Sequence, residues 1–537
     1  MQQILFNGHI YQQKDQFVSA LLIEDGYILH CGSDSEILAF NNPDIKVIDL
    51  QGKTVVPGFN DSHLHFYMSA VAFQTVDLYG LTSIDLIVKR ASDFLDRHPL
   101  ATGITLFGRG WNQDYFSDEA RLLTRFDLDR ISVDFPIAFT RACGHVVTCN
   151  SKALEVLGID ASTPQIEGGQ FDTDAQGYPL GIFRENAIGL LASLQAPLSL
   201  KERVNLLNQV AQIANQYGIT SVQTNDLTFG SSEGAAIQEA YEVYAHKNPT
   251  VRIYHQCSFS DLDALQQRIN EGYHQNENAF HRYGPLKLFV DGSLGARTAL
   301  MRQTYHDDPT TKGISCMSQE QCDAFVSLAD QHHIQIAIHA IGDGGIEQVL
   351  NAYQKVIHHE NTHRHGIVHC QITDYPLLQR FRAMDIVAYV QPIFLHYDMH
   401  IVNDRVGQAL ASSSYAFKTM EDLGLHVAYG TDSPVEGLNV FHNIHCALNR
   451  QDLNGFPSQG FYPNEKVTLE SAIDHLTIDG AYTSFEENQK GRLLSGYMAD
   501  LVVLNQAIFS LDPSQIKMGL VDLTMVNGQI VYNRTCN

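Results

Sequence analysis

The residues that could do chemistry are histidines, a lysine and an aspartate at the ends of short apolar segments. His63 and His65 stand two positions apart after one such segment. Because successive side chains of a strand alternate between its faces, both imidazoles would point to one side and could bind one metal ion. Four later apolar segments end in Lys287, His339, His369 and Asp432. Imidazole and carboxylate are good zinc ligands, and this set is spread too widely along the chain for a structural zinc finger.

Lys287 is the unusual member of this set, because a free lysine is protonated at neutral pH and binds metal poorly. Between the apolar Leu286 and Leu288, and beside cations, its pKa would be lowered and its amine could be neutral. A neutral amine can add carbon dioxide to form a carbamate, whose two oxygens could bridge two metal ions. An unmodified lysine at the edge of the core is the alternative.

Eight apolar segments could carry these residues as strands, and most intervals between them can hold a helix. The segments are residues 54–65, 218–224, 251–255, 286–290, 336–339, 366–369, 386–391 and 426–432. Alternating strands and helices predict a parallel sheet in an α/β fold, and eight units predict a closed (β/α)8 barrel. Such barrels gather their active-site residues at the C-terminal ends of the strands.

The spacing of the candidate ligands predicts how further domains join this barrel. His339 and His369 are one barrel unit of about 30 residues apart, whereas the interval from His65 to Lys287 exceeds three units by about 130 residues. This surplus predicts an inserted subdomain at 95–195 that enters from the catalytic face and could cap the site. Short strands with Asn-Gly and Asp-Gly turns at both ends predict a composite β-sandwich from residues 1–56 and 485–537, leaving 57–484 for the barrel.

Composition restricts the partners of the protein. The 537 residues include 60 acidic and 35 basic side chains, a net charge of −25, which argues against a nucleic-acid or anionic-membrane binder. No signal-peptide pattern and no apolar segment of membrane-spanning length is present, and nine scattered cysteines without a CxxC motif indicate free thiols. We therefore expect a cytoplasmic protein that acts on a small molecule, with a homodimer as a possible assembly.

Ordered motifs over nearly the whole chain carry a family resemblance. They are residues 57–65 (PGFNDSHLH), 108–111 (GRGW), 144–145 with 150–154, 291–295 (DGSLG), 339–343 (HAIGD), 430–435 (GTDSPV), 499–504 and 526–528. This set resembles the amidohydrolase superfamily of metal-dependent hydrolases, and within it the YtcJ-like branch, amidohydrolase family 3, which includes N-substituted formamide deformylase. The departures are small: Asn60 and Cys370 differ from the residues common in the family, and neither change removes a ligand.

The resemblance implies a site for two divalent metal ions, with zinc favoured by the ligand types. The more buried ion would be bound by three side chains, His63, His65 and Asp432. The second ion would be bound by His339 and His369. A carboxylated Lys287 would bridge the two ions.

The activity implied is hydrolysis of a C–N bond, other than a peptide bond, in an amide-type substrate by metal-activated water. Asp432 would take a proton from the water and later pass it to the leaving amine. Trp111 and His145, both in the predicted insertion, are candidate substrate-binding residues, with His145 as a donor to the developing oxyanion. Trp111 could equally well pack in the core of the insertion.

Three alternatives stay open at this point. A mononuclear deaminase and a cyclic-amide hydrolase belong to the same superfamily, but deaminases usually add a glutamate beside a strand-end histidine, and none follows His339 or His369. A non-catalytic scaffold on the same fold is the alternative from another class, since fold does not fix function. Such a relative would be expected to lose ligands, whereas all six ligand positions are filled here.

Overall fold

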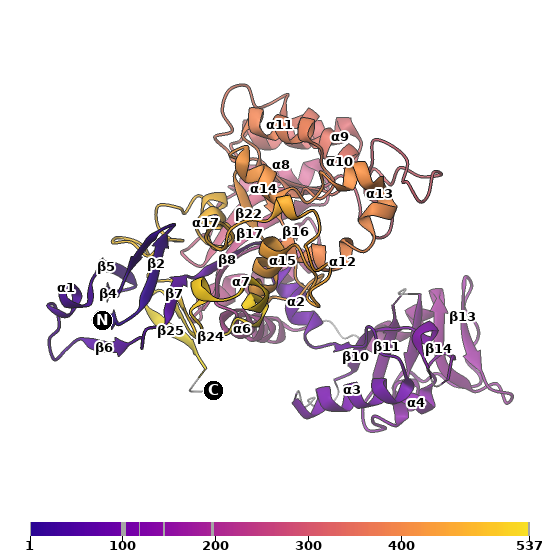
Figure 1. The fold of residues 1–537 in the computed structure, drawn as a ribbon. Coiled ribbons are helices and arrows are strands. Elements are labelled where there is room, and N and C mark those ends of the chain that lie inside the picture. Colours follow the sequence, from indigo (N-terminus) through magenta and orange to yellow (C-terminus); the bar gives the residue numbers. More distant parts are fainter. Residues whose placement is uncertain (1, 98–103, 118, 143–144, 195–197, 535–537) are drawn as a thin grey trace. The chain divides into compact units, whose positions relative to one another are not determined.

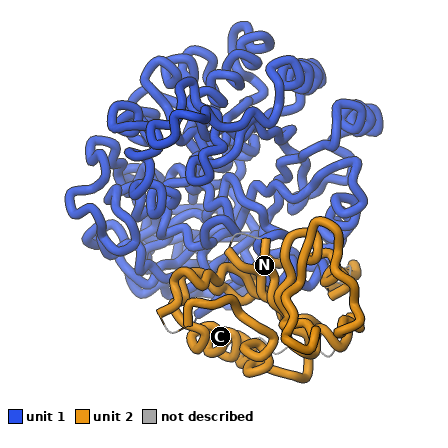
Figure 2. The backbone as a smooth tube through the Cα atoms, turned by 90° about the vertical axis from the view of Figure 1, so that its right-hand side faces the viewer, with its two compact units in different colours: residues 1–69, 203–537 blue, residues 70–202 orange. Residues whose placement is uncertain are grey.

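The computed structural model describes residues 2–97, 104–117, 119–142, 145–194 and 198–534. They belong to two compact units, residues 1–69 with 203–537 and residues 70–202 (Figure 1, Figure 2). The first unit contains a barrel and a two-sheet domain, and the second is the inserted domain. Among the described residues, no helix is both long and apolar enough to cross a membrane.

The barrel is a parallel sheet whose neighbouring strands are, in order, β8 (Phe59–Leu64), β15 (Ile219–Thr224), β17 (Arg252–Phe259), β18 (His281–Phe289), β19 (Ile336–Ala340), β20 (Gly366–His369), β21 (Val387–Val390) and β22 (Val427–Tyr429). Its first and last strands meet where the Asp432 N–H donates to the His63 carbonyl over 2.8 Å. The predicted fold class, a (β/α)8 barrel with an insertion and a terminal β-sandwich, is confirmed.

Helices follow the barrel strands and bury apolar faces against them. The main ones are α6 (Leu200–Gln216), α7 (Ser232–Ala245), α8 (Leu262–Glu271), α9 (Gln319–Gln331), α10 (Asp343–Tyr353), α11 (Tyr375–Met384) and α15 (Val440–Asn449). On α10 the buried residues Ile346, Val349, Leu350 and Tyr353 have the three-to-four residue spacing of one helix face. This helix packs on β19, whose C-terminal end carries His339.

Both ends of the chain contribute strands to the two-sheet domain. One sheet has the order β5 (Tyr27–Gly32), β4 (Ala20–Glu24), β1 (Gln2–Phe6) and β6 (Lys46–Asp49). The other has the order β25 (Gln529–Asn533), β24 (Val521–Val526), β23 (Leu501–Leu504), β7 (Thr54–Pro57), β2 (His9–Gln13) and β3 (Gln16–Val18). Residues of both sheets share one core that includes Leu21, Ile23, Val55, Leu501 and Met525.

Two local expectations for this domain are wrong. Residues 54–57, expected to lead the first barrel strand, form β7, which pairs with β2 and β23 in the sandwich, so the barrel strand starts at Phe59. Asn7-Gly8 does not close a hairpin, because β1 and β2 lie in different sheets. Asp25-Gly26 and Asn527-Gly528 do close hairpins, and both residues of each pair have the positive φ that this turn requires.

The second unit has its own sheet, with the strand order β13 (Gly169–Thr173), β14 (Pro179–Glu185), β12 (Val146–Cys149), β11 (Ile137–Arg141), β10 (Leu106–Trp111) and β9 (Val76–Asp77). The compact unit starts at residue 70, earlier than the predicted 95, because β9 pairs with β10 and α3 (Ile84–Arg97) packs on the same core. That this unit caps the site stays a prediction.

Candidate metal centre

The six predicted ligands lie at the C-terminal ends of the barrel strands. The imidazoles form a row, with ring centroids 5.6 Å apart for His65 and His63, 5.5 Å for His63 and His369, and 4.4 Å for His369 and His339. The Lys287 Nζ lies 3.4 Å from the His63 Nε2. Asp432 follows β22 and faces His63 of β8 and His65, which comes directly after this strand. The fold therefore brings together residues that are far apart in the sequence.

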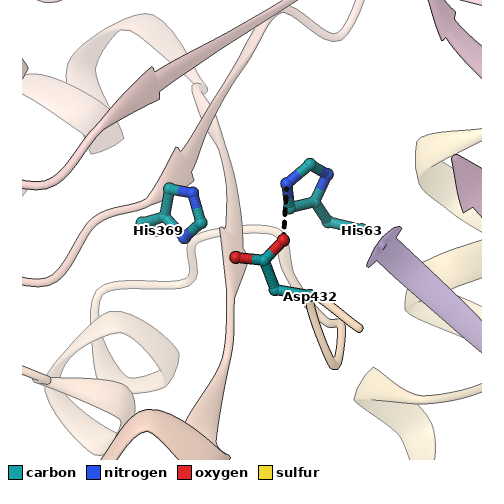
Figure 3. Close-up of side chains that lie close together, drawn as sticks. All are labelled: His63, His369 and Asp432. Carbon is teal, nitrogen blue, oxygen red and sulfur yellow. Dashed lines mark ion pairs between the residues drawn. The ribbon is translucent and has the colours of Figure 1, made fainter. Parts of the chain in front are cut away.

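Asp432 is the one carboxylate among the six predicted ligands, and Figure 3 shows it with His63 and His369. Its Oδ1 is 3.5 Å from the His63 Nε2 and 3.4 Å from the His65 Nε2. Ligand atoms of His63, His369 and Asp432 all lie within 4.8 Å of one another, and the three residues are buried. The Asp432 Oδ1 is buried without a hydrogen-bond partner among the described atoms. A buried oxygen of this kind needs a partner, and a cation held with the two imidazoles would supply one.

Two glutamines decide which nitrogen of two histidines faces the centre. The Gln256 Nε2 donates to the Ser62 carbonyl, so its Oε1 accepts the proton of the His63 Nδ1 at 2.7 Å. Gln391 is arranged in the same way, with Nε2 donating to the Tyr389 carbonyl and Oε1 lying 2.8 Å from the His369 Nδ1. Both histidines therefore turn an unprotonated Nε2 toward the centre, as metal ligands do.

The other two histidines are fixed by backbone carbonyls, which can only accept a proton. The His65 Nδ1 lies 2.6 Å from the Asn225 carbonyl, which leaves its Nε2 free for a metal. In His339 the roles are reversed, because its Nε2 lies 3.1 Å from the Gly292 carbonyl and 3.3 Å from the Asp291 Oδ1. His339 therefore offers Nδ1, the nitrogen opposite to the one that the other three histidines offer.

Burial favours the neutral forms of His63, His369 and Lys287. It lowers the pKa of His63 and of His369 well below the usual value, so both are neutral ligands at physiological pH. Burial also lowers the pKa of Lys287 to about 7. A substantial fraction of Lys287 is therefore a neutral amine near pH 7, the form that adds carbon dioxide.

Asp61 ties together the two strands that close the barrel beside the centre. It is buried and accepts hydrogen bonds from the Thr431 Oγ1 at 2.6 Å, the Thr431 N–H at 3.0 Å and the His63 N–H at 3.3 Å. No sequence motif predicts a role for Asp61, and none predicts a role for Gln256, Gln391 or Asn225. A polar residue within a buried apolar strand was the available signal for Asp61 and the two glutamines.

Two ligands have backbone conformations that their residue types seldom adopt. His369 has φ = 83° and Asp432 has φ = 56°, both in the left-handed region. Such conformations cost free energy and persist where the surrounding contacts impose them, as at binding sites. The Asp432 N–H bond to the His63 carbonyl is one such contact.

A cavity of about 730 Å³ adjoins the centre and is lined by His65 and Lys287. Most of its remaining wall is apolar and comes from Phe259, Leu262, Phe289, Met317 and Phe325. Two aspartates in the lining have structural partners. Asp226 accepts from the Tyr67 N–H, the Tyr241 hydroxyl and the Thr224 hydroxyl, and Asp261 caps helix α8. The cavity is therefore suited to an apolar group of a small molecule.

The two candidate substrate-binding residues lie in the second unit. Trp111 has no exposed surface, and its Nε1–H donates to the Phe139 carbonyl within the core of that unit, which fits the core-packing interpretation. His145 is exposed, and its Nδ1 lies 2.9 Å from the Glu185 Oε2. Its neighbour Gly144 in the quoted motif is outside the described residues. Neither residue is among the ligands assembled in the first unit.

Known proteins are similar to this chain over nearly its whole length. The sequence profile of the amidohydrolase family matches residues 46–532. The putative amidohydrolase YtcJ of Bacillus subtilis (strain 168) is 30% identical over 100% of both chains, and N-substituted formamide deformylase of Arthrobacter pascens is 26% identical over 98% of this chain and 97% of its own. The crystal structure of an uncharacterized metal-dependent hydrolase from Pyrococcus furiosus is 27% identical, with a TM-score of 0.75 over 96% of this chain and 100% of that one. The chain belongs to the amidohydrolase family.

Proposed function

We propose that the protein is a metal-dependent amidohydrolase that hydrolyses a C–N bond in an amide-type small molecule. The observation that carries the proposal is the row of four imidazoles, each with one nitrogen held by the protein, of which three lie beside a buried Asp432 Oδ1 that lacks a hydrogen-bond partner among the described atoms. This donor set fits a divalent cation such as zinc. The family match supports hydrolysis as the reaction.

The six residues of the proposed centre would bind two metal ions. His63, His65 and Asp432 would hold one ion, His339 and His369 would hold a second, and a carboxylated Lys287 would be a ligand shared by both. The low pKa of Lys287 supports this modification, because only the neutral amine reacts with carbon dioxide. Bound metal ions lower the pKa of water toward neutrality and polarise a substrate carbonyl.

Asp432 moves the proton in the proposed reaction. Its carboxylate takes a proton from the attacking water, and the oxygen of that water forms a bond to the carbonyl carbon. The same carboxyl group then protonates the nitrogen as the C–N bond breaks, so the products are a carboxylic acid and an amine. Asp432 is suited to both steps because the Asp432 N–H bond to the His63 carbonyl fixes its place beside the imidazoles.

The cavity beside Lys287 and His65 indicates that the substrate carries an apolar group. The similarity to an N-substituted formamide deformylase makes N-alkyl and N-aryl formamides the first compounds to test. The test is release of the amine by the zinc-loaded protein, with the Asp432→Asn variant as the negative control. Amine release that depends on Asp432 supports the proposal. Equal release by both proteins, or turnover only of compounds in which a ring amine is deaminated, contradicts it.

A further inference from the structure

A second group of histidines lies at the other ends of two ligand-bearing strands. Helix α9 ends at Gln331 and is followed by His333, whereas His363 and His365 come just before β20. With Asp330 of α9 they form a hydrogen-bonded chain. The His333 Nδ1 is 3.1 Å from the His363 Nε2, and the Asp330 Oδ1 is 3.1 Å from the His363 Nδ1 and 3.0 Å from the His365 Nε2. We call these four residues the lower histidine cluster.

The most compact metal-binding set in this cluster, Asp330 with His363 and His365, is ruled out by the hydrogen bonds of His365. The His365 Nδ1 accepts the backbone N–H of Ile336 at 3.1 Å, and that N–H can only donate. The neutral ring therefore carries its proton on Nε2, and this N–H donates a hydrogen bond to Asp330. His365 has no free lone pair for a metal, and it is buried.

His363 is held in the opposite state. Its Nδ1–H donates to the carboxylate of Asp330, so its Nε2 carries a lone pair. A histidine that donates one N–H to a carboxylate and offers the other nitrogen has the arrangement of many metal ligands, in which the carboxylate fixes the tautomer and makes the ligand more basic. The nearby Arg364 does not oppose a cation, because its guanidinium is paired with Glu487.

We propose that His333 and His363 form a second, surface metal site for a zinc-like divalent cation, with Asp330 holding His363 in the ligating tautomer. Two zinc–nitrogen bonds of about 2.0–2.1 Å at a tetrahedral angle place the nitrogens about 3.3 Å apart. The observed separation is 3.1 Å. The cation replaces the hydrogen bond between these nitrogens: His333 then carries its proton on Nε2 instead of Nδ1, and its exposed ring rotates to point the Nδ1 lone pair at the ion. Water completes the coordination.

Hydrogen bonds fix the conformation of the loop that carries His363. Asn361 accepts the His365 N–H at 2.8 Å and donates to the carbonyls of His365 and Asp385, which fixes residues 361–365 before any ion arrives. The sequence HHENTHRH over residues 358–365 is rich in histidine, as short metal-binding tracts are. Only His363 of this tract combines a carboxylate partner with a histidine facing its free nitrogen.

The test is zinc uptake by the untagged protein with its metal centre already loaded. Equilibrium dialysis followed by elemental mass spectrometry counts the ions per chain. We expect saturable uptake of one further ion, and we expect His333→Gln and His363→Gln each to weaken it by ~10-fold or more. A His358→Gln/His359→Gln double variant is the matched control, because both residues are exposed in the same tract, and it should bind like the unchanged protein.

Three results would overturn this second site. They are the absence of a further ion in the unchanged protein, uptake that only one of the two single variants reduces, and loss of uptake in the control variant. His333→Gln alters an exposed side chain, so a folding defect does not obscure the result, and unchanged hydrolytic activity verifies that the variant is folded. The two variants leave the metal centre unchanged, since His333 and His363 precede β19 and β20, whose C-terminal ends carry His339 and His369.

Discussion

Strands β19 and β20 have histidines near both ends, and the hydrogen bonds of these histidines differ between the two ends. At the C-terminal ends, His339 and His369 each give one nitrogen to the protein and keep the other for the centre. At the N-terminal ends, both ring nitrogens of His365 are hydrogen-bonded within the protein. Its Nδ1 accepts the Ile336 N–H, and its Nε2–H donates to Asp330. A histidine is not a metal ligand by residue type alone. Its hydrogen bonds decide whether one of its ring nitrogens keeps a lone pair that can bind a metal.

The largest expected effect comes from the proton-transfer residue at the C-terminal end. Asp432→Asn keeps the shape but removes the basic carboxylate, so we expect hydrolysis to fall by ~10³-fold. The measurement is kcat on the best substrate found, with His333→Gln, from the opposite end, as a control that keeps full activity. Comparable losses of kcat in the two variants would contradict the distinction between the C-terminal and N-terminal ends of the strands.

The next effect concerns Lys287 and depends on pH. Burial lowers its pKa to about 7, so the neutral amine is scarce below that pH and dominant above it. We expect bicarbonate to increase metal uptake by the metal-free protein much more above pH 7 than below it. A Lys287→Met variant should lose both the response to bicarbonate and one of the two ions. Metal uptake that bicarbonate does not change at any pH would argue for an unmodified Lys287.

A smaller effect is expected from the glutamines that set the tautomers. Gln256→Leu and Gln391→Leu leave every ligand in place but free His63 or His369 to turn, so metal affinity should fall by ~10–100-fold. Competition with a chromophoric chelator measures this affinity. Gln335→Leu is the matched control, because Gln335 is also buried but lies next to the N-terminal end of β19. Equal losses of affinity in all three variants would show that the glutamines only support the fold.

The smallest effect separates stability from catalysis. His365→Leu removes hydrogen bonds to Ile336 and Asp330, so we expect it to lower the free energy of unfolding by ~1–3 kcal/mol. Activity per folded molecule should not change. Denaturant unfolding and kcat, measured on the same samples, give both numbers. A loss of activity without a loss of stability would place His365 in the functional machinery.

The ligand set could be predicted from the sequence because each ligand ends an apolar strand. The barrel rule then places all strand ends at one face, even for Lys287 and His63, which are 224 positions apart. The same periodicity predicted the eight strands and the sandwich at the two ends. The division of residues 54–64 between β7 and β8 was missed, because the segment is continuous in the sequence and only strand pairing shows that it is divided between two sheets.

The supporting contacts could not be predicted, because they depend on which side chains meet in space. Asp61 binds Thr431 over 370 positions, and Gln256 binds His63 over 193. The lower histidine cluster could not be predicted either, because only the fold brings His333 to His363. The start of the inserted unit was placed too late because β9 has only two residues and leaves little periodicity to detect.

The most direct test of the metal centre is metal content per chain, measured by elemental mass spectrometry on untagged protein purified without chelators. The His333→Gln background removes the proposed surface ion from the count. We predict about two zinc-like ions per chain, and about one when His63 and Asp432, which belong to the same proposed ion, are replaced together by asparagine. One ion would favour a mononuclear centre. No bound ion, even after zinc and bicarbonate are added, would contradict the central claim that these strand ends hold a catalytic metal.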